Sequence, residues 1–197
     1  MKIYTPKELS IRNKVLVELN NILKNLYIKF FLIDGVLLGA IREGDFIKWD
    51  WDIELAVLTE DVIETIEKII LEAKKKNFKV ENPDRTLENL KINFYKYDVK
   101  ITLVGLMRYK NYRQRKLFRY PAKYFEKPDR IFFRGEEYLI PTPVEELLEY
   151  TYGKNWRIPK ISNSKREYLS PEIFRESYLN KIRYKIKKCY IKLLSNY

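Results

Sequence analysis

The chain has 197 residues, of which 39 are Lys or Arg and 27 are Asp or Glu, so its formal net charge is +12. It contains no histidine, which excludes Ser-His and Cys-His catalysis and any zinc site built on imidazole. Its single cysteine, Cys189, excludes an intramolecular disulfide and a thiolate metal site. A bound metal would therefore be a hard cation with oxygen ligands.

The composition is that of a folded globular protein, with 46% apolar and 34% charged residues. The N-terminus has no apolar signal segment and no apolar run reaches about 18 residues, so we expect a cytoplasmic protein. The positive charge favours an anionic partner, which could be nucleic acid, a membrane surface or a phosphorylated substrate. A biased genome would also explain the charge, so charge alone does not choose among these partners.

Helices and strands are predicted to interleave along the first half of the chain. Thr5, Pro6 and Glu8 form an N-cap signature that predicts a helix to about residue 26. The next elements are a β-rich run at 28–33, one or two helical turns at 36–42, a strand at 51–58, a helix from 59 to about 76, a brief strand at 78–80 and a turn at Asn82-Pro83-Asp84.

The second half begins with two β-rich pieces at 91–106, which form either one long strand or a hairpin around Tyr97-Asp98. Further elements are a basic and aromatic segment at 108–120, a hairpin that turns at Gly135, a helix from Pro143 to Gly153 and a last helix at 171–194. We therefore predict an α/β fold with a mixed sheet, in which residues 1–160 form one domain and residues 161–197 a C-terminal helical extension.

Carboxylates stand at alternate positions in Trp49-Asp50-Trp51-Asp52-Ile53-Glu54. On a strand, Asp50, Asp52 and Glu54 would project from one face, roughly 6–7 Å apart. Like charges this close repel one another unless a cation lies between them, and Mg²⁺ or Mn²⁺ binds carboxylate and phosphate oxygens readily. The alternative is an exposed strand edge whose charges face water.

Two glycines precede this acidic segment in Asp34-Gly35-Val36-Leu37-Leu38-Gly39. Where a strand turns into a helix, backbone N–H groups and the helix dipole can hold a phosphate, and small residues let it approach. Arg42 follows and offers a forked donor to phosphate oxygens. A phosphate cradle followed by a metal-binding strand suits a phosphoryl or nucleotidyl transferase. Outside this context, the glycines would be turn and packing residues.

The segment from Asp34 to Glu54 resembles the signature of the LicD family, which includes fukutin-related proteins and reads, loosely, G-x-L-L-G-x-x-R-x-x-x-F-I-P-W-D-x-D-I-D. A second stretch, which starts at Tyr120-Pro121 and ends at Tyr152-Gly153-Lys154-Asn155-Trp156, is similar to the family's downstream run that ends in Y-G-x-x-W. The chain departs from the pattern at Lys48, Trp51 and Glu54, of which Glu54 keeps the charge of the usual Asp on a longer arm.

The resemblance implies a nucleotidyltransferase-like mixed β-sheet flanked by helices. It also implies an enzyme that uses Mg²⁺ or Mn²⁺ to move a phospho-alcohol group, such as phosphocholine or ribitol phosphate, from a CDP-activated donor to a cell-surface glycan or its lipid-linked precursor. The implied catalytic and metal residues are Asp50, Asp52 and, for the metal, Glu54. The resemblance places Gly35 and Gly39 in a phosphate-approach loop, and Arg42 would steady either phosphate or the acidic strand. We also expect Lys100 and Lys154 to bind substrate or phosphate.

Nucleotidyltransferase folds commonly add one more carboxylate from a neighbouring strand, and Asp98 is the candidate for it. It would act as a second metal ligand or as the base for the acceptor hydroxyl. An Asp among β-branched and aromatic residues is otherwise poorly tolerated unless it is paired. The alternatives are a salt bridge with Lys96 or Lys100, and a turn.

The basic regions leave rival functions open. Residues 108–119 interleave arginines with aromatic rings, which could stack bases, so a rival enzyme would transfer NMP from an NTP to RNA, protein or a small molecule. The predicted helix at 171–194 is basic and amphipathic and would either pack on the domain or touch an anionic membrane surface. A third alternative is a binding module without activity. The acidic segment argues against that module and the second resembling stretch against RNA, so nucleic acid is not the expected partner.

Overall fold

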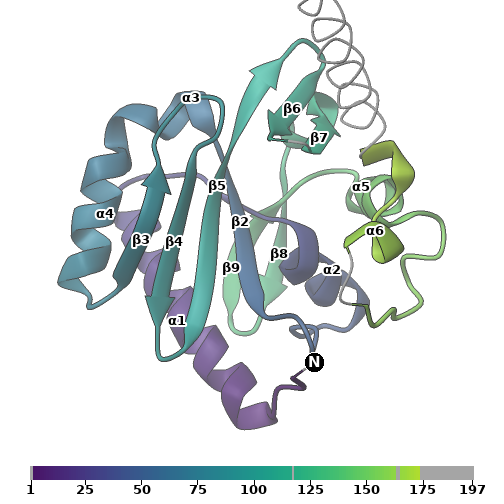
Figure 1. The fold of residues 1–197 in the computed structure, drawn as a ribbon, viewed down its shortest axis with the longest axis horizontal. Coiled ribbons are helices and arrows are strands. Elements are labelled where there is room, and N and C mark those ends of the chain that lie inside the picture. The colour runs from purple at the N-terminus through teal and green to yellow at the C-terminus, as the bar shows by residue number, and fades with distance from the viewer. Residues whose placement is uncertain (1, 117, 163–164, 174–197) are drawn as a thin grey trace, which may run out of the picture.

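The computed structural model describes residues 2–116, 118–162 and 165–173. Over these ranges the chain forms a large mixed sheet with helices packed against it (Figure 1). The predicted α/β class with a mixed sheet is therefore confirmed. The predicted helix at 171–194 lies almost wholly outside the described residues, and the domain division at residue 160 stays a prediction.

The sheet has nine strands within the described ranges. They are β1 (Phe31–Leu32), β2 (Asp52–Leu58), β3 (Lys79–Asp84), β4 (Lys91–Lys96), β5 (Val99–Tyr109), β6 (Tyr112–Arg115), β7 (Phe118–Pro121), β8 (Asp129–Phe133) and β9 (Glu136–Ile140). Their order is β3-β4-β5-β2-β1-β9-β8, and β6 pairs with the end of β5 and with β7. The pairs β2/β5 and β1/β9 are parallel, and the others are antiparallel.

The helices are α1 (Pro6–Asn25), α2 (Asp34–Arg42), α3 (Thr59–Val62), α4 (Ile66–Lys75), α5 (Val144–Tyr152) and α6 (Lys165–Tyr168), with 3₁₀ turns η1 (Ile63–Thr65) and η2 (Ala122–Phe125). Helix α1 crosses behind the central strands and contacts α4 and β5, whereas α2 contacts β2 (Figure 1). The acidic segment at the start of β2 therefore lies between α1 and α2.

Helix α1 begins where the sequence predicts, because Thr5 and Glu8 form a reciprocal capping box and Pro6 occupies the first turn. Its apolar stripe is fully buried against the sheet and includes Val15, Leu16, Leu19 and Leu23. The hairpin β8/β9 and the end of α5 at Gly153 (φ +83°) also agree with the sequence.

Two predicted elements differ from the structure. The helix predicted at 59–76 is broken into α3, η1 and α4, in a run rich in β-branched residues, which crowd a continuous helix. The predicted turn at Asn82-Pro83-Asp84 is instead the end of β3, where the register shifts between Glu81 and Asp84. A proline is tolerated there because β3 is an edge strand with an irregular ladder.

Candidate active site

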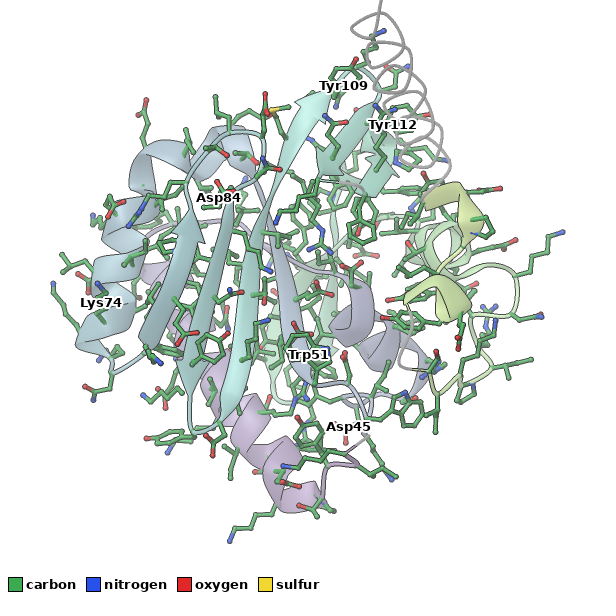
Figure 2. All side chains as sticks on the ribbon, in the orientation of Figure 1. Asp45, Trp51, Lys74, Asp84, Tyr109 and Tyr112 are labelled. Atoms are coloured by element: carbon green, nitrogen blue, oxygen red, sulfur yellow. The ribbon has the colours of Figure 1, made fainter. Side chains whose placement is uncertain are left out.

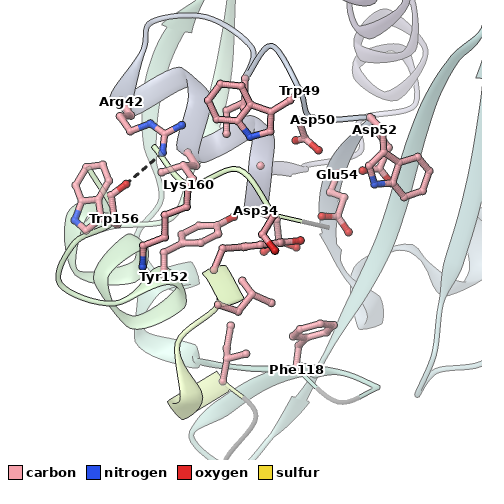
Figure 3. A pocket seen from close by; sticks show the side chains of 18 of the residues that line it. Asp34, Arg42, Trp49, Asp50, Asp52, Glu54, Phe118, Tyr152, Trp156 and Lys160 are labelled. Carbon is pink, nitrogen blue, oxygen red and sulfur yellow. Dashed lines mark hydrogen bonds between the residues drawn. The ribbon is translucent and has the colours of Figure 1, made fainter. Parts of the chain in front are cut away.

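A cavity of about 350 Å³ opens at the N-terminal end of β2 (Figure 3). Its walls come from α2, the start of β2, β6 and β7, and from residues within 152–162 and 168–173. Four carboxylates line it, namely those of Asp34, Asp50, Asp52 and Glu54. The cations that line it are Lys2, Arg42, Arg115 and Lys160. The size lies within the range of small-molecule sites.

The three predicted acidic residues all line this cavity, but they do not all lie on β2. Asp52 and Glu54 lie on β2 and share one of its faces, as alternation along a strand requires. Asp50, however, precedes the strand, and its N–H donates to the carbonyl of Ile47 at 3.1 Å in a turn. The prediction that all three stand on one strand is therefore wrong for Asp50, although all three line the cavity.

Arg12 holds the backbone of this acidic segment from behind. It lies on α1 with 3% of its surface exposed, and its guanidinium donates to the carbonyls of Asp50 and of Asp52, the latter at 2.8 Å. The rings of Tyr4 and Phe46 pack over it, with centroids at 5.0 and 5.2 Å. Sequence reasoning missed Arg12 because an arginine in an amphipathic helix usually faces water.

Gly35 makes room for the carboxylate of Asp50. A Cβ on Gly35 would lie 2.0 Å from Oδ2 of Asp50, so a larger residue would displace that side chain. Gly39, by contrast, is absent from the cavity wall, and a Cβ there would lie 2.5 Å from the backbone carbonyl of Asp45. The structure thus places Gly35 in the site and makes Gly39 a packing glycine, which corrects the phosphate-loop prediction for Gly39.

Arg115 joins the two remaining carboxylates. It reaches in from β6 and donates to Asp34 and, at 3.3 Å, to Glu54. Tyr120 on β7 donates its hydroxyl to Asp34 at 2.9 Å. Burial and the charge of Asp34 raise the pKa of Tyr120 well above its usual value, so this hydroxyl stays a donor. Sequence reasoning missed both partners, because Arg115 lay within a segment interpreted as a basic surface.

Asp34 itself has a left-handed backbone conformation, with φ +52° at the first residue of α2. A residue other than glycine rarely adopts this conformation, and such strain is concentrated at functional sites. The contacts with Arg115 and Tyr120 account for the orientation of its side chain.

Lys100 lies beside the acidic segment because Asp52 and Lys100 are register partners in the parallel pair β2/β5. Its ammonium is 3.5 Å from Oδ2 of Asp52 and lies over the ring of Trp51, 4.1 Å from the centroid. Lys100 is absent from the cavity wall. Its predicted contact with substrate phosphate therefore remains a prediction, and its observed partner is Asp52.

The other two predicted phosphate ligands lie differently. Arg42 lines the cavity, but its guanidinium donates to Glu43 and, at 3.3 Å, to the carbonyl of Trp156 (Figure 3). Arg42 thereby ties α2 to the chain that follows α5. Lys154 is exposed and absent from the cavity wall, whereas its neighbours Asn155 and Trp156 line it. The structure therefore does not bring Lys154 into the site.

Asp98 also lies away from the cavity. It is exposed in the two-residue turn between β4 and β5, with φ +59°, and Lys96 pairs with Val99 across that turn. The residues of β5 that stand beside Asp52 and Glu54 are Lys100 and Thr102. The structure thus shows the turn alternative and corrects the assignment of Asp98 as a metal ligand or base.

The basic and aromatic segment at 108–120 is not a uniform basic surface. Arg108 pairs with Glu126, and Arg113 pairs with Glu60 at 2.7 Å. Figure 2 shows Tyr109 and Tyr112 at the top of the molecule and Trp51, which lines the cavity, below them near the middle. Much of the charge that suggested nucleic acid therefore serves internal ion pairs or, in Arg115, the candidate site.

The surroundings of Asp50 oppose the ionisation of its carboxyl group. Burial, followed by the charge of Asp52, raises its pKa from 3.8 to about 7, although Arg12 acts in the opposite direction.

The neighbouring carboxylates of Asp50 and Asp52 fit a divalent cation. Within the described ranges no group of three or more ligating side chains is arranged to hold a metal, and Glu54 is bound to Arg115. Mg²⁺ commonly uses one or two carboxylates together with water and phosphate.

We expect Asp50→Asn to raise the melting temperature at pH 8 and to raise it little at pH 4.5. Because the folded state binds this proton more tightly than the unfolded state, the contribution of Asp50 to stability falls as the pH rises from about 4 to about 7. The full shift corresponds to about 4 kcal/mol, and partial solvent contact reduces this to about 2 kcal/mol, or about 4–8 °C. Equal changes at both pH values would contradict the assignment.

Residues 27–143 match the sequence profile described as LicD/FKTN/FKRP, nucleotidyltransferase domain. The chain belongs to the LicD/FKTN/FKRP family. This LicD-family chain is also 49% identical over 35 residues to ribitol 5-phosphate transferase FKRP of Mus musculus and of Homo sapiens. The match covers 18% of the chain and spans only 7% of those relatives' length.

Two solved structures share the fold of this LicD-family chain. One is the lincosamide antibiotic adenylyltransferase LnuA, with a TM-score of 0.51, 9% identity and coverage of 84% of this chain and 94% of that one. The other is ANT(2")-Ia, with a TM-score of 0.51, 11% identity and coverage of 90% and 97%. The predicted nucleotidyltransferase-like fold is thus confirmed, and family and fold together indicate a transferase.

The described residues include no helix with both the length and the apolar character needed to cross a bilayer. The predicted cytoplasmic location stays a prediction. The predicted membrane contact through 171–194 falls almost entirely outside the described residues.

Proposed function

We propose that this LicD-family chain uses Mg²⁺ or Mn²⁺ to transfer a phospho-alcohol group, such as phosphocholine or ribitol phosphate, from a CDP-activated donor to a glycan or its lipid-linked precursor. One observation carries the proposal. The carboxylates of Asp50 and Asp52 lie together at the N-terminal end of β2, beside Gly35 at the N-terminus of α2, in a cavity with room for a small molecule. The family and its 35-residue likeness to a ribitol 5-phosphate transferase support the donor class.

In this reaction the acceptor hydroxyl oxygen forms a bond to the phosphorus that bears the alcohol. The bond from that phosphorus to the bridging oxygen breaks, CMP leaves with that oxygen, and the proton of the hydroxyl passes to water. A bound divalent cation would neutralise the developing negative charge on the phosphate oxygens. Asp50 and Asp52 would hold that cation. Arg12 fixes the spacing of these two carboxylates through their backbone carbonyls.

The cations at the cavity wall are suited to a diphosphate. Lys2 and Lys160 line the cavity, and Arg42 holds the segment at Trp156 in place to close one side. Trp49 and Trp51 offer aromatic surfaces at the same cavity, which a nucleoside base or a sugar could contact.

The product formed from each donor tests the proposal. CDP-choline, CDP-ribitol and CDP-glycerol, each with Mg²⁺, are compared with the four NTPs, and CMP and pyrophosphate are quantified. We expect CMP from at least one CDP-alcohol, a raised melting temperature with that donor, and no pyrophosphate. Pyrophosphate from an NTP would favour the rival transfer of NMP. Neither product and no thermal shift with any donor would favour the binding module.

A further inference from the structure

A polar strip crosses the sheet beside the cavity. It consists of alternate residues of β4 and β5 that share one face of the sheet, namely Lys91, Asn93, Tyr95, Lys100 and Thr102. The residues that alternate with them, such as Ile92, Phe94 and Ile101, are fully buried on the other face, against which α1 packs (Figure 1). The polar strip therefore faces away from α1.

Strand register joins the polar strip to the candidate site. Asp52 is the register partner of Lys100, which is in turn the partner of Tyr95. Glu54 begins a second row with Thr102. Because neighbouring strands lie about 4.8 Å apart, each row leads from a carboxylate of β2 to a residue of β4 within about 10 Å. A substrate whose reacting group lies at Asp52 can therefore extend over the strip.

One hydrogen bond fixes the centre of the strip. The hydroxyl of Thr102, which is 2% exposed, donates to Oδ1 of Asn93 at 3.1 Å. The amide nitrogen of Asn93 is then its remaining hydrogen-bonding group, and it has no partner among the described residues. This N–H group is available to a ligand oxygen.

Lys91 brings an unpaired positive charge to the strip. It is half-buried, and within residues 2–116, 118–162 and 165–173 it has no hydrogen bond or ion pair from its side chain. Its register partner on β3 is Asp84, but the carboxylate of Asp84 accepts from the hydroxyl of Thr86 at 2.8 Å instead. A lysine that is half-buried without an anion is unusual, because the lost hydration is not replaced.

Like charges surround Lys91. Burial, followed by the charges of Lys100 and Lys116, lowers its pKa, and Glu54 opposes this shift only in part. Lys100 is paired with Asp52, whereas Lys116 is an exposed residue directly after β6. An anion held by Lys91 and Lys116 would relieve this repulsion and accept hydrogen bonds from both ammonium groups.

We propose that Lys91 and Lys116, together with the amide of Asn93, bind a phosphate group of the acceptor outside the cavity. Along β4, Lys91 lies four residues, or about 13 Å, from the row that contains Asp52. The acceptor is therefore an extended saccharide that carries a phosphate at this distance from its reacting hydroxyl. The proposal rests on the proposed function in assigning the ligand to the acceptor, but the anion site itself does not depend on which group is transferred.

Inorganic phosphate and glucose 6-phosphate, titrated by calorimetry into the full chain without a divalent cation, test the anion site. Without a metal the four carboxylates of the cavity repel phosphate, so binding reports on the strip. We expect one ligand per chain, a loss of affinity of at least tenfold in Lys91→Gln, and a loss below threefold in Lys91→Arg. The matched control is Lys79→Gln, on the same face but paired with Glu81, which should stay within twofold.

A loss of binding in Lys91→Gln should not come from unfolding. The substitution removes a charge that its neighbours repel, so the melting temperature should not fall. The proposal is overturned if phosphate does not bind the unmodified chain, or if Lys91→Gln binds it as tightly as the unmodified chain does.

Titration of CDP with Mg²⁺ separates the acceptor from the donor as the source of the phosphate. We expect the affinity for CDP to be the same within twofold in Lys91→Gln and in the unmodified chain. A tenfold loss would give the site to the donor and overturn the proposal. If CDP does not bind the unmodified chain at all, the proposed donor class is wrong, whereas the anion site is still decided by the phosphate titration.

Discussion

Asp52→Asn is expected to lower the rate of CMP release at least about 1,000-fold at saturating Mg²⁺. A metal ion stabilises the transition state by several kcal/mol, and each 1.36 kcal/mol is a factor of ten in rate. Asn has the same shape, but the ion pair with Lys100, 3.5 Å long, is largely buried, so removal of its carboxylate costs up to about 3 kcal/mol, which the lost repulsion from Asp50 partly offsets. The melting temperature should therefore fall by no more than about 12 °C, which leaves the variant folded for the assay.

The matched control for this variant is Asp98→Asn. Asp98 is an exposed turn residue with a positive φ, a conformation that Asn tolerates well, so rate and stability should both stay unchanged. If the turnover of Asp52→Asn is within tenfold of that of the unmodified chain, the proposal that Asp52 is a metal ligand is wrong. A large loss of turnover in Asp98→Asn would instead restore Asp98 as a catalytic candidate.

Arg12→Met should have the largest effect on stability, since it removes a buried guanidinium that donates to two backbone carbonyls. Each buried acceptor left without a donor costs about 1–3 kcal/mol, so we expect a loss of about 2–6 kcal/mol and a fall in melting temperature of at least about 4 °C. Mn²⁺ affinity should also fall at least tenfold, because the carbonyls of Asp50 and Asp52 are no longer held at a fixed spacing.

Two further variants test whether the effect of Arg12 comes from its forked hydrogen bonds or from its charge alone. Arg12→Lys keeps the charge but cannot donate to both carbonyls in a fork, so it should recover less than half of the lost stability. Arg130→Met removes an exposed ion pair with Glu137 and should change stability by no more than about 1 kcal/mol. If Arg12→Met melts within 2 °C of the unmodified chain, Arg12 does not support the acidic segment as described.

The sequence predicted those features that depend on neighbours along the chain. The capping box at Thr5, the turn at Gly135 and the helix end at Gly153 are local signals, and the structure has each of them. The acidic alternation likewise placed Asp52 and Glu54 on one face of β2. Local signals gave the wrong element where strand pairing determines the structure. At Pro83 the sequence predicts a turn, whereas the structure has the end of the edge strand β3, which accommodates a proline.

The partners of the site could not be predicted, because they come from distant segments and have no pattern of their own. Arg12 reaches the carbonyls of Asp50 and Asp52 across 38 and 40 positions, and nothing in its helix distinguishes it from solvated basic residues. Asp98 was ambiguous for the converse reason. Its surroundings are β-rich on both sides, and the Tyr97-Asp98 pair lacks the Asn-Gly or Asp-Gly sequence that usually identifies a two-residue turn.

The bridge formed by Arg115 has a consequence for exchanging parts between related domains. The guanidinium lies 61 positions after Glu54 and 81 positions after Asp34, on a strand outside the segment that carries the family signature. A chimera that receives only residues 34–54 acquires two largely buried carboxylates without their counterion, and such uncompensated charge is destabilising. The transferable unit is therefore the signature segment together with β6 and β7, although the two are far apart in the chain.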